Sequence, residues 1–167
     1  MMEFHADSFN VFNKGWALLT AGSGQHYNTM TISWGGLGTL WGKPVATVYV
    51  KPIRYTHEFL ETSDYFTISF YPEKYRPALQ LLGTLSGRDS DKVAQAALTP
   101  RPLDDAVTFD EADVTLVCKK IYRQDMDPAQ MPSQVVSAFY TKEAAHTMYV
   151  GEVVEIVHDT TPSQTLH

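Results

Sequence analysis

The sequence has few cysteines, few charges and no long apolar run, and each shortage excludes a class of protein. Cys118 is the only cysteine among 167 residues, so the chain can form neither an internal disulfide nor a cysteine-rich zinc or iron–sulfur site. The apolar runs are all shorter than the roughly 20 residues that a transmembrane helix needs. The first residues lack the basic and apolar segments of a secretory signal. We therefore expect a cytoplasmic protein that does not insert into membranes.

Charged residues make up only 19% of the chain, whereas hydrophobic residues make up 44%. Typical proteins carry about 25% charged residues, so this composition excludes a disordered chain and favours one that hides extra surface, for example by dimerising. The length suits one domain, and the chain has no repeat, low-complexity run or linker. We expect residues 1–167 to form a single domain.

The net charge of −6 argues against nucleic acid as a partner. The charge is unevenly distributed, because residues 1–101 carry nine cationic residues against eight acidic ones and residues 102–167 carry four against eleven. Six of the thirteen cationic residues lie between Lys51 and Lys92. An anionic ligand is therefore expected to bind against this middle stretch.

Short alternating or β-branched runs predict strands, and amphipathic runs between them predict helices. The predicted strands are residues 16–20, 28–34, 44–50, 65–70, 113–122 and 146–157, and the predicted helices are residues 56–63, 73–82 and 90–98. Gly35 and Gly36 are expected to end the second strand. The first three strands follow one another too closely for crossover helices. The pattern therefore predicts an α+β fold, a mainly antiparallel closed or split β-barrel with inserted helices.

Several catalytic signatures are missing from the sequence. Trp41 stands where a dinucleotide-binding fingerprint needs its third glycine, and there is no P-loop and no nucleophile elbow. The six histidines lack the short spacings that place two ligands on one face of an element, so we expect no metal site. Cys118 lies in an apolar strand and is expected to be a buried, inert thiol.

Two segments of the cationic stretch suit a phosphate group. Lys51, Arg54 and Thr56 lie where a buried strand leads into a helix, and Thr56 is expected to cap that helix. By spacing alone, a basic strand end with a threonine cap fits this segment equally well.

The second segment is residues 86–92. Here Gly87 would allow an unusual turn, Ser90 or Asp89 would cap the next helix, and Arg88 and Lys92 flank it. Alone this pattern is typical of an ordinary capped helix. Both segments together, within the one cationic stretch, predict a phosphate-bearing ligand.

Residues 28–35 offer a different kind of surface. Threonine and serine alternate there with Met30, Ile32 and Trp34, so hydroxyl and backbone groups lie beside a flat apolar side chain. That combination suits an aromatic heterocycle with polar edges. A sheet edge with Trp34 in the core would produce the same pattern, and the sequence does not decide between the two.

Five segments resemble the flavin reductase-like family of FMN-binding split β-barrels, and the flavoredoxin-type members in particular. They are WALLTAG (16–22), NTMTISWG (28–35), KPIRYT (51–56), SGRDSDK (86–92) and HTMYVGEV (146–153). The segments follow the order of the family and extend over nearly the whole chain. SGRDSDK is similar to a Ser-Gly-Arg-Asp-x-Asp-Lys motif of that subgroup.

The resemblance implies a set of FMN-binding residues. The ring would lie along Met30, Thr31, Ile32, Ser33 and Trp34, bordered by Val50, Lys51 and Pro52, and the phosphate end would be held by Arg54, Tyr55, Thr56, Ser86, Gly87, Arg88 and Lys92. Relatives often have arginine at position 51, and lysine keeps the charge but loses the two-point contact. His146 could approach the flavin face, although a structural role at a strand start suits it better.

The resemblance also implies a homodimer with one FMN per subunit near the dimer interface. NAD(P)H would pass hydride to the flavin, and because the cofactor performs the chemistry, we assign no catalytic residue beyond the weak candidate His146. One alternative is an electron-transfer protein that a protein partner reduces. Another is an FMN-binding protein without turnover. A redox protein or a monooxygenase is a possible partner.

Overall fold

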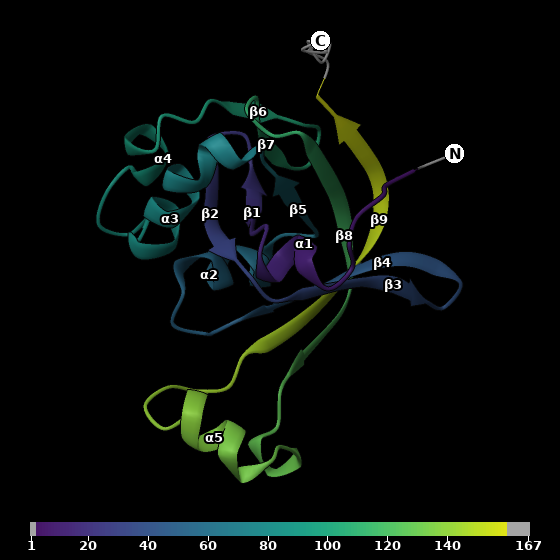
Figure 1. Cartoon of the computed structure of the whole chain (residues 1–167), viewed down its shortest axis with the longest axis vertical. Helices are drawn as coiled ribbons and strands as arrows, with labels where there is room; N and C mark the ends of the chain where they lie inside the picture. Colours follow the sequence, from purple (N-terminus) through teal and green to yellow (C-terminus); the bar gives the residue numbers. More distant parts are fainter. Residues whose placement is uncertain (1–2, 160–167) are drawn as a thin grey trace.

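The computed structural model describes residues 3–159 of the chain. The strands are β1 (Ala17–Ser23), β2 (His26–Ile32), β3 (Gly35–Leu40), β4 (Lys43–Val50), β5 (Tyr65–Phe70), β6 (Pro100–Pro102), β7 (Val107–Phe109), β8 (Val114–Asp125) and β9 (Thr147–His158). The helices are α1 (Asn10–Asn13), α2 (Tyr55–Thr62), α3 (Arg76–Thr84), α4 (Lys92–Gln95) and α5 (Ser133–Phe139), with short 3-10 turns at Glu73–Tyr75 and Pro128–Gln130. The α+β class is confirmed (Figure 1).

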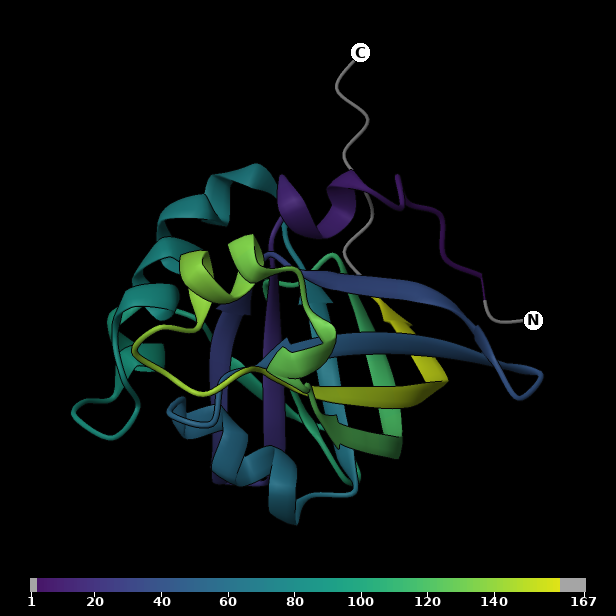
Figure 2. The ribbon, with the colours of Figure 1, turned by 90° about the horizontal axis from the view of Figure 1, so that it is seen from below.

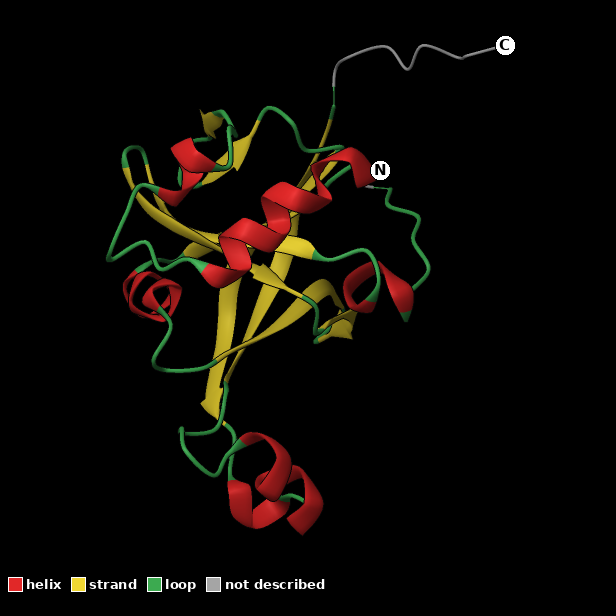
Figure 3. Cartoon of the chain, turned by 60° about the vertical axis from the view of Figure 1, so that its left-hand side comes forward, coloured by secondary structure: helices red, strands yellow, loops and turns green. Residues whose placement is uncertain are grey.

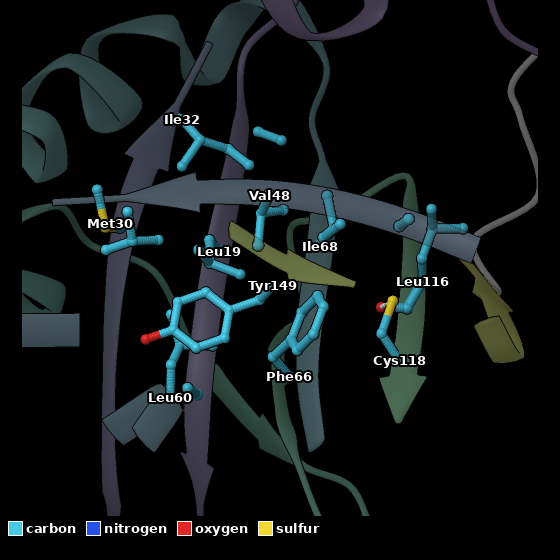
Figure 4. Close-up of a cluster of buried hydrophobic side chains, with 14 of the residues drawn as sticks. Leu19, Met30, Ile32, Val48, Leu60, Phe66, Ile68, Leu116, Cys118 and Tyr149 are labelled. Atoms are coloured by element: carbon cyan, nitrogen blue, oxygen red, sulfur yellow. Dashed lines mark hydrogen bonds between the residues drawn. The ribbon is translucent and has the colours of Figure 1, made fainter. Parts of the chain in front are cut away.

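Seven strands form one antiparallel sheet in the order β2-β1-β5-β8-β9-β4-β3. Met30 of β2 and Val48 of β4 belong to the same buried cluster, although their strands are five positions apart. Strands are spaced about 4.8 Å apart, so a flat sheet would separate them by roughly 24 Å. The sheet therefore curls around one core, which Figure 4 shows with Tyr149 and Phe66 at its centre.

A second cluster covers the outer face of β1. Leu18 packs there with Leu79 and Leu82 of α3, whereas its neighbour Leu19 points into the barrel core. This alternation follows from the period of two along a strand. As a consequence, α3 lies against the β1–β2 side of the barrel, where its C-terminal end borders the cavities described below.

Strands β8 and β9 extend beyond the body of the barrel and carry a projecting segment between them, residues 126–146, which we call the arm (Figures 1 and 3). The arm includes α5, and none of the residues of this helix is buried. At the base of the arm, the Met126 amide donates to the His146 carbonyl at 3.0 Å. Pro128 and Pro132 both lie in this segment.

Two predictions of secondary structure were wrong, and one pair of strands was missed. Gly35 and Gly36 were expected to end the second strand, but that strand ends at Ile32 and the two glycines begin the next strand, β3. A tight turn at Trp41 and Gly42, both with positive φ (52° and 72°), joins β3 to its antiparallel partner β4. This hairpin extends outward in Figure 2. The predicted helix at 90–98 is only Lys92–Gln95. The short pair β6 and β7 was missed because Pro100 and Pro102 disfavour a strand.

Cys118 is fully buried in the core, as expected, and burial raises the pKa of its thiol. Within residues 3–159, every helix is too short or too polar to cross a membrane.

Gly151 lies where β9 crosses the core. A Cβ at this position would be 2.6 Å from Phe66 Cζ and 2.7 Å from the Cβ of Cys118. We expect Gly151→Ala to lower the free energy of unfolding by about 1–3 kcal/mol, because the core must shift to accept the methyl group. Urea unfolding followed by fluorescence measures this change.

Gly38→Ala is the matched control, since its Cβ would meet no atom within 4 Å and its φ is not positive. Both variants change the unfolded chain in the same way, so their difference isolates the packing effect. Equal stability of the two variants would contradict the tight packing at Gly151.

Candidate functional site: two joined cavities at the edge of β2

Two neighbouring cavities open along the free edge of β2. The first, which we call the cationic cavity, has a volume of about 320 Å³ and is lined by Asn28, Met30, Ile53, Arg54, Tyr55, Thr56, Gly83, Thr84, Leu85, Ser86, Gly87 and Lys92. The second, the aromatic cavity, has a volume of about 190 Å³ and is lined by Met30, Thr31, Ile32, Ser33, Trp34, Tyr49, Arg54 and His146. Because Met30 and Arg54 line both, one extended ligand can occupy both cavities.

The edge of β2 forms the wall that faces these cavities. On one side, β2 pairs with β1, with Ile32 opposite Ala17; on the other side it is the last strand of the sheet. Within the described part of the chain, no hydrogen bond from another segment reaches the main chain of residues 30–34 on that side. In an antiparallel pair, alternate residues direct their N–H and C=O groups away from the partner strand. This edge therefore offers backbone donors and acceptors to a ligand.

Side chains of β2 fix the neighbouring segments around that edge. Thr31 Oγ1 donates to the Leu79 carbonyl of α3, and Asn28 Nδ2 donates to Thr56 Oγ1 in the first turn of α2 at 2.7 Å. These bonds hold α2 and α3 on either side of the strand. The space between the two helices is the cationic cavity.

Arg54 directly precedes α2 and lines both cavities. Within residues 3–159, its guanidinium makes no hydrogen bond to protein, so its donors are available to a ligand. Burial lowers the pKa of Arg54, and the Glu143 carboxylate opposes that effect. The side chain remains a cation, because an arginine does not lose its proton in a protein.

Lys92 begins α4 and is the second cation of this cavity. Only 3% of the residue is exposed. Its ammonium donates to the carbonyls of Leu82 (3.3 Å) and Leu85 (3.1 Å). Burial, followed by the charge of Arg54, lowers the pKa of Lys92 to about 8. An ammonium has three donors, so one is left for a ligand in the cavity.

The capping roles differ from those expected. Arg54, with extended backbone, is the N-cap of α2 and makes no side-chain capping bond, while Thr56 lies buried in the first turn and accepts from Asn28. Asp91, rather than Asp89 or Ser90, caps α4 by accepting from the Ala94 amide. A shift of one or two residues in each helix start moves the cap, and such boundaries are the least certain part of a sequence prediction.

Gly87 serves a different purpose from the one predicted. Its φ is not positive, so no unusual turn is formed. Instead, a Cβ there would lie 2.1 Å from Asn28 Oδ1 and 3.3 Å from the Tyr55 ring. Glycine therefore lets residues 83–92 close against β2 and α2. The preceding residue, Ser86, supports the loop by accepting from the Arg88 amide at 3.2 Å.

Arg88 does not reach either cavity. Its guanidinium pairs with Glu58 of α2, donates to the Ile53 carbonyl at 3.1 Å and lies over the Tyr55 ring at 4.7 Å. The side chain thus joins residues 83–92 to the start of α2. A direct contact between Arg88 and a ligand stays a prediction.

The structure brings together most, but not all, of the predicted ligand-binding residues. Those that line a cavity are Met30, Thr31, Ile32, Ser33, Trp34, Arg54, Tyr55, Thr56, Ser86, Gly87, Lys92 and the weak candidate His146. Besides Arg88, three others line neither cavity. Val50 is buried in the core, Pro52 is exposed, and Lys51 forms an ion pair with Glu143 of the arm at 2.7 Å.

An aromatic group closes the outer end of the aromatic cavity. Trp34 is 43% exposed and is therefore not a core residue; its ring meets Phe139 of the arm at 5.3 Å and His146 at 5.5 Å. His146 Nδ1 is hydrogen-bonded to the Tyr140 hydroxyl at 2.6 Å. Burial, followed by the charge of Lys51, lowers the pKa of His146, so its neutral form is favoured.

Sequence reasoning missed several lining residues. Tyr49 was hidden in a run interpreted as a buried strand, although alternation places it on the opposite face from Val50. Asn28 was part of a quoted motif without an assigned role. Residues 83–85 line the cationic cavity because they lie at the C-terminal end of α3. No motif in the sequence marks them as ligand-binding residues.

A larger cavity, of about 760 Å³, lies elsewhere, between the N-terminal residues and β8. Its rim carries the carboxyl groups of Glu3, Asp7 and Asp113. These groups disfavour an anionic ligand. The cavities beside β2 are therefore the better candidates for the anion site that the charge distribution predicts.

Comparisons with known proteins agree with this geometry. The sequence profile described as "Flavin reductase like domain" matches residues 9–167. A comparison with curated proteins found no significant match.

Solved structures share the fold at low sequence identity. Flavoredoxin from Methanosarcina acetivorans superposes with a TM-score of 0.70 at 17% identity, over 96% of this chain and 76% of that one. Flavoredoxin of Desulfovibrio vulgaris (Miyazaki F) gives 0.68 at 22% identity, over 96% and 77%. The NADH:FAD oxidoreductase SgcE6 of Streptomyces globisporus C-1027 gives 0.66 at 16% identity, over 86% and 74%.

These likenesses confirm the split-barrel fold that the sequence predicted. Together with the profile match over nearly the whole chain, they lead to one conclusion: the chain belongs to the flavin reductase-like family.

Proposed function

We propose that this protein is an FMN-binding oxidoreductase of the flavin reductase type, which takes hydride from NAD(P)H. The observation that carries the proposal is the junction of a cavity containing Arg54 and Lys92 with the free edge of β2 and its aromatic cavity. This arrangement has one end for a phosphate and one for a planar ring with polar edges.

The phosphate end fits the cationic cavity by its chemistry. Arg54 and Lys92 supply two cations with available donors, and Thr56 and Ser86 add hydroxyl groups. Charge-assisted hydrogen bonds to a phosphate each contribute about 1.5–3 kcal/mol. Gly87 lines this cavity with main chain alone. A side chain at this position would clash with Asn28 and displace that part of the cavity wall.

The ring end fits the edge of β2. The main chain of residues 30–34 would hydrogen-bond the polar edge of the ring, while Trp34 and His146 lie at the outer end of the cavity. Bound FMN would supply the hydride-transfer chemistry. The residues of this chain would bind and orient it, and backbone amides along β2 would stabilise negative charge on the reduced ring. Neutral His146 would exclude water without having to move a proton.

We also propose that the protein acts as a homodimer. Three large apolar side chains near the cavities, those of Trp34, Ile53 and Phe139, are 43–54% exposed. The arm that carries Phe139 projects from the body (Figure 3) and α5 buries none of its residues within one chain. A second copy that covers these side chains would remove apolar surface from water. A redox protein or a monooxygenase is the partner class that would use the electrons.

Arg54→Ala should weaken FMN binding by roughly ten- to a hundredfold, since the phosphate would lose a charge-assisted contact. The measurement is the dissociation constant from quenching of flavin fluorescence, together with the flavin retained after gel filtration. Lys43→Met is the control, because it removes a cation that pairs with Glu152 outside both cavities. Wild-type FMN affinity in Arg54→Ala would exclude this phosphate site.

FMN affinity should fall as the pH rises above about 8. Lys92 has a pKa lowered to about 8 in the free protein, and only its protonated form attracts a phosphate. A bound phosphate raises that pKa, so binding is linked to proton uptake. We expect the dissociation constant to rise about five- to tenfold between pH 7.5 and pH 9. Lys92→Met should bind more weakly and lose this dependence; an unchanged pH profile in that variant would contradict the role of Lys92.

Steady-state oxidation of NADH and NADPH with added FMN tests the reductase activity. We expect at least one donor to be oxidised. If both fail while bound flavin is reduced cleanly by dithionite, the reductase proposal is wrong, and an electron carrier reduced by a protein partner takes its place. A protein that retains no FMN and oxidises no donor would contradict both functions.

A further inference from the structure

The ion pair between Lys51 and Glu143 links the barrel to the arm. Lys51 directly follows β4, and its Nζ lies 2.7 Å from Glu143 Oε2. The same ammonium donates to the Phe139 carbonyl at 3.2 Å and lies 5.7 Å from the centre of the Tyr140 ring. A cation expected to face the ligand is therefore already bound to a carboxylate of the protein itself.

Glu143 also acts on groups that line the aromatic cavity. Its charge favours the protonated forms of Arg54 and His146, and both of these residues line that cavity. In return, Lys51, Arg54 and His146 all lower the pKa of Glu143. The carboxylate is therefore the anionic member of a group of cationic or titratable side chains beside the cavity.

The segment that carries Glu143 lies against the outer end of the aromatic cavity. Phe139 meets Trp34 there at 5.3 Å, and Tyr140 is hydrogen-bonded to His146 at 2.6 Å. With a ring bound in the aromatic cavity, a second ligand that stacks beside Trp34 and His146 would lie next to this segment. Any phosphate groups on that ligand would encounter Lys51 and Glu143 together.

We propose that Glu143 is a specificity-determining residue that weakens the binding of a phosphate-bearing second ligand, such as a dinucleotide hydride donor, by occupying Lys51. This inference rests on the proposed function, because it concerns the donor that meets the bound flavin. An anionic group must compete with the Glu143 carboxylate for the Lys51 ammonium. A neutral ligand meets no such competition, so Glu143 discriminates by charge and not by shape.

The expected effect is modest because the pair is partly exposed to solvent. The side chains of Lys51 and Glu143 are 25% and 36% exposed, and partly exposed pairs are screened by water and salt. Removing the negative charge should therefore tighten binding of an anionic ligand by about two- to fivefold. The gain should shrink at high salt and should depend on Lys51.

The test uses two probes that differ in charge, ADP-ribose, which has a diphosphate, and neutral nicotinamide. Isothermal titration calorimetry in the presence of saturating FMN, which occupies the cationic cavity, gives their dissociation constants for the wild type, Glu143→Gln and the double variant Glu143→Gln with Lys51→Met. We expect Glu143→Gln to bind ADP-ribose about two- to fivefold more tightly and nicotinamide without change. The double variant should lose the gain.

Glu152→Gln is the matched control. It removes the same charge from another carboxylate that forms an ion pair, with Lys43 at 2.9 Å, and Glu152 lines neither cavity. This control should bind ADP-ribose like the wild type. Thermal unfolding shows whether each variant is folded, and Glu143→Ala replaces Glu143→Gln if that variant is not.

The proposal is overturned if Glu143→Gln binds ADP-ribose no more tightly than the wild type, including the case in which neither binds it. It is also overturned if Glu152→Gln gives the same gain, or if the double variant keeps it. FMN retention by the wild type is measured separately. Loss of that retention alone counts against the proposed function, whereas the comparison of ADP-ribose affinities decides the role of Glu143.

Discussion

The free edge of β2 is the feature on which the rest of the site depends. The strand order of the curled sheet places β2 and β3 at its two edges. An unpaired edge exposes backbone donors and acceptors that would otherwise attract another strand. Here α2 and α3 flank that edge, held by side-chain bonds from Asn28 and Thr31. Because helices cannot complete the strand ladder, the backbone groups remain available to a ligand.

Electrostatics divides the site into two unlike ends. At the cationic cavity, within residues 3–159, no carboxylate is hydrogen-bonded to Arg54 or Lys92. Burial lowers the pKa of Lys92. Outside the aromatic cavity, Lys51 is neutralised by Glu143, and His146, which lines that cavity, favours its neutral form. An anion is therefore attracted most strongly to the cationic cavity. A ligand with one charged end and one planar end has a single preferred orientation.

Several residues chosen from the sequence have roles that their local pattern did not indicate. Gly87 is close to Asn28, which is distant in sequence, and no turn rule contains that information. Thr56 was expected to cap a helix, and instead its hydroxyl accepts from the same Asn28. Arg88 and Lys51 are cations within the predicted stretch, yet carboxylates from other segments neutralise them. In each case, a contact with a residue distant in the sequence determines the role, and for the two cations it decides whether the side chain faces the ligand site or is bound by the protein itself.

The sequence by itself determined the alternation that forms the strands, the antiparallel α+β fold, the burial of Cys118 and the cationic stretch that holds the candidate site. These properties follow from local periodicity, composition and the order of short motifs. Only the tertiary structure decided which cations face the cavities, that Trp34 is exposed, and that Glu143 of the arm reaches Lys51. The physical reason is that charge neutralisation and burial depend on residues that the fold brings together from distant positions, 92 residues apart for Lys51 and Glu143. A local sequence pattern does not contain that information.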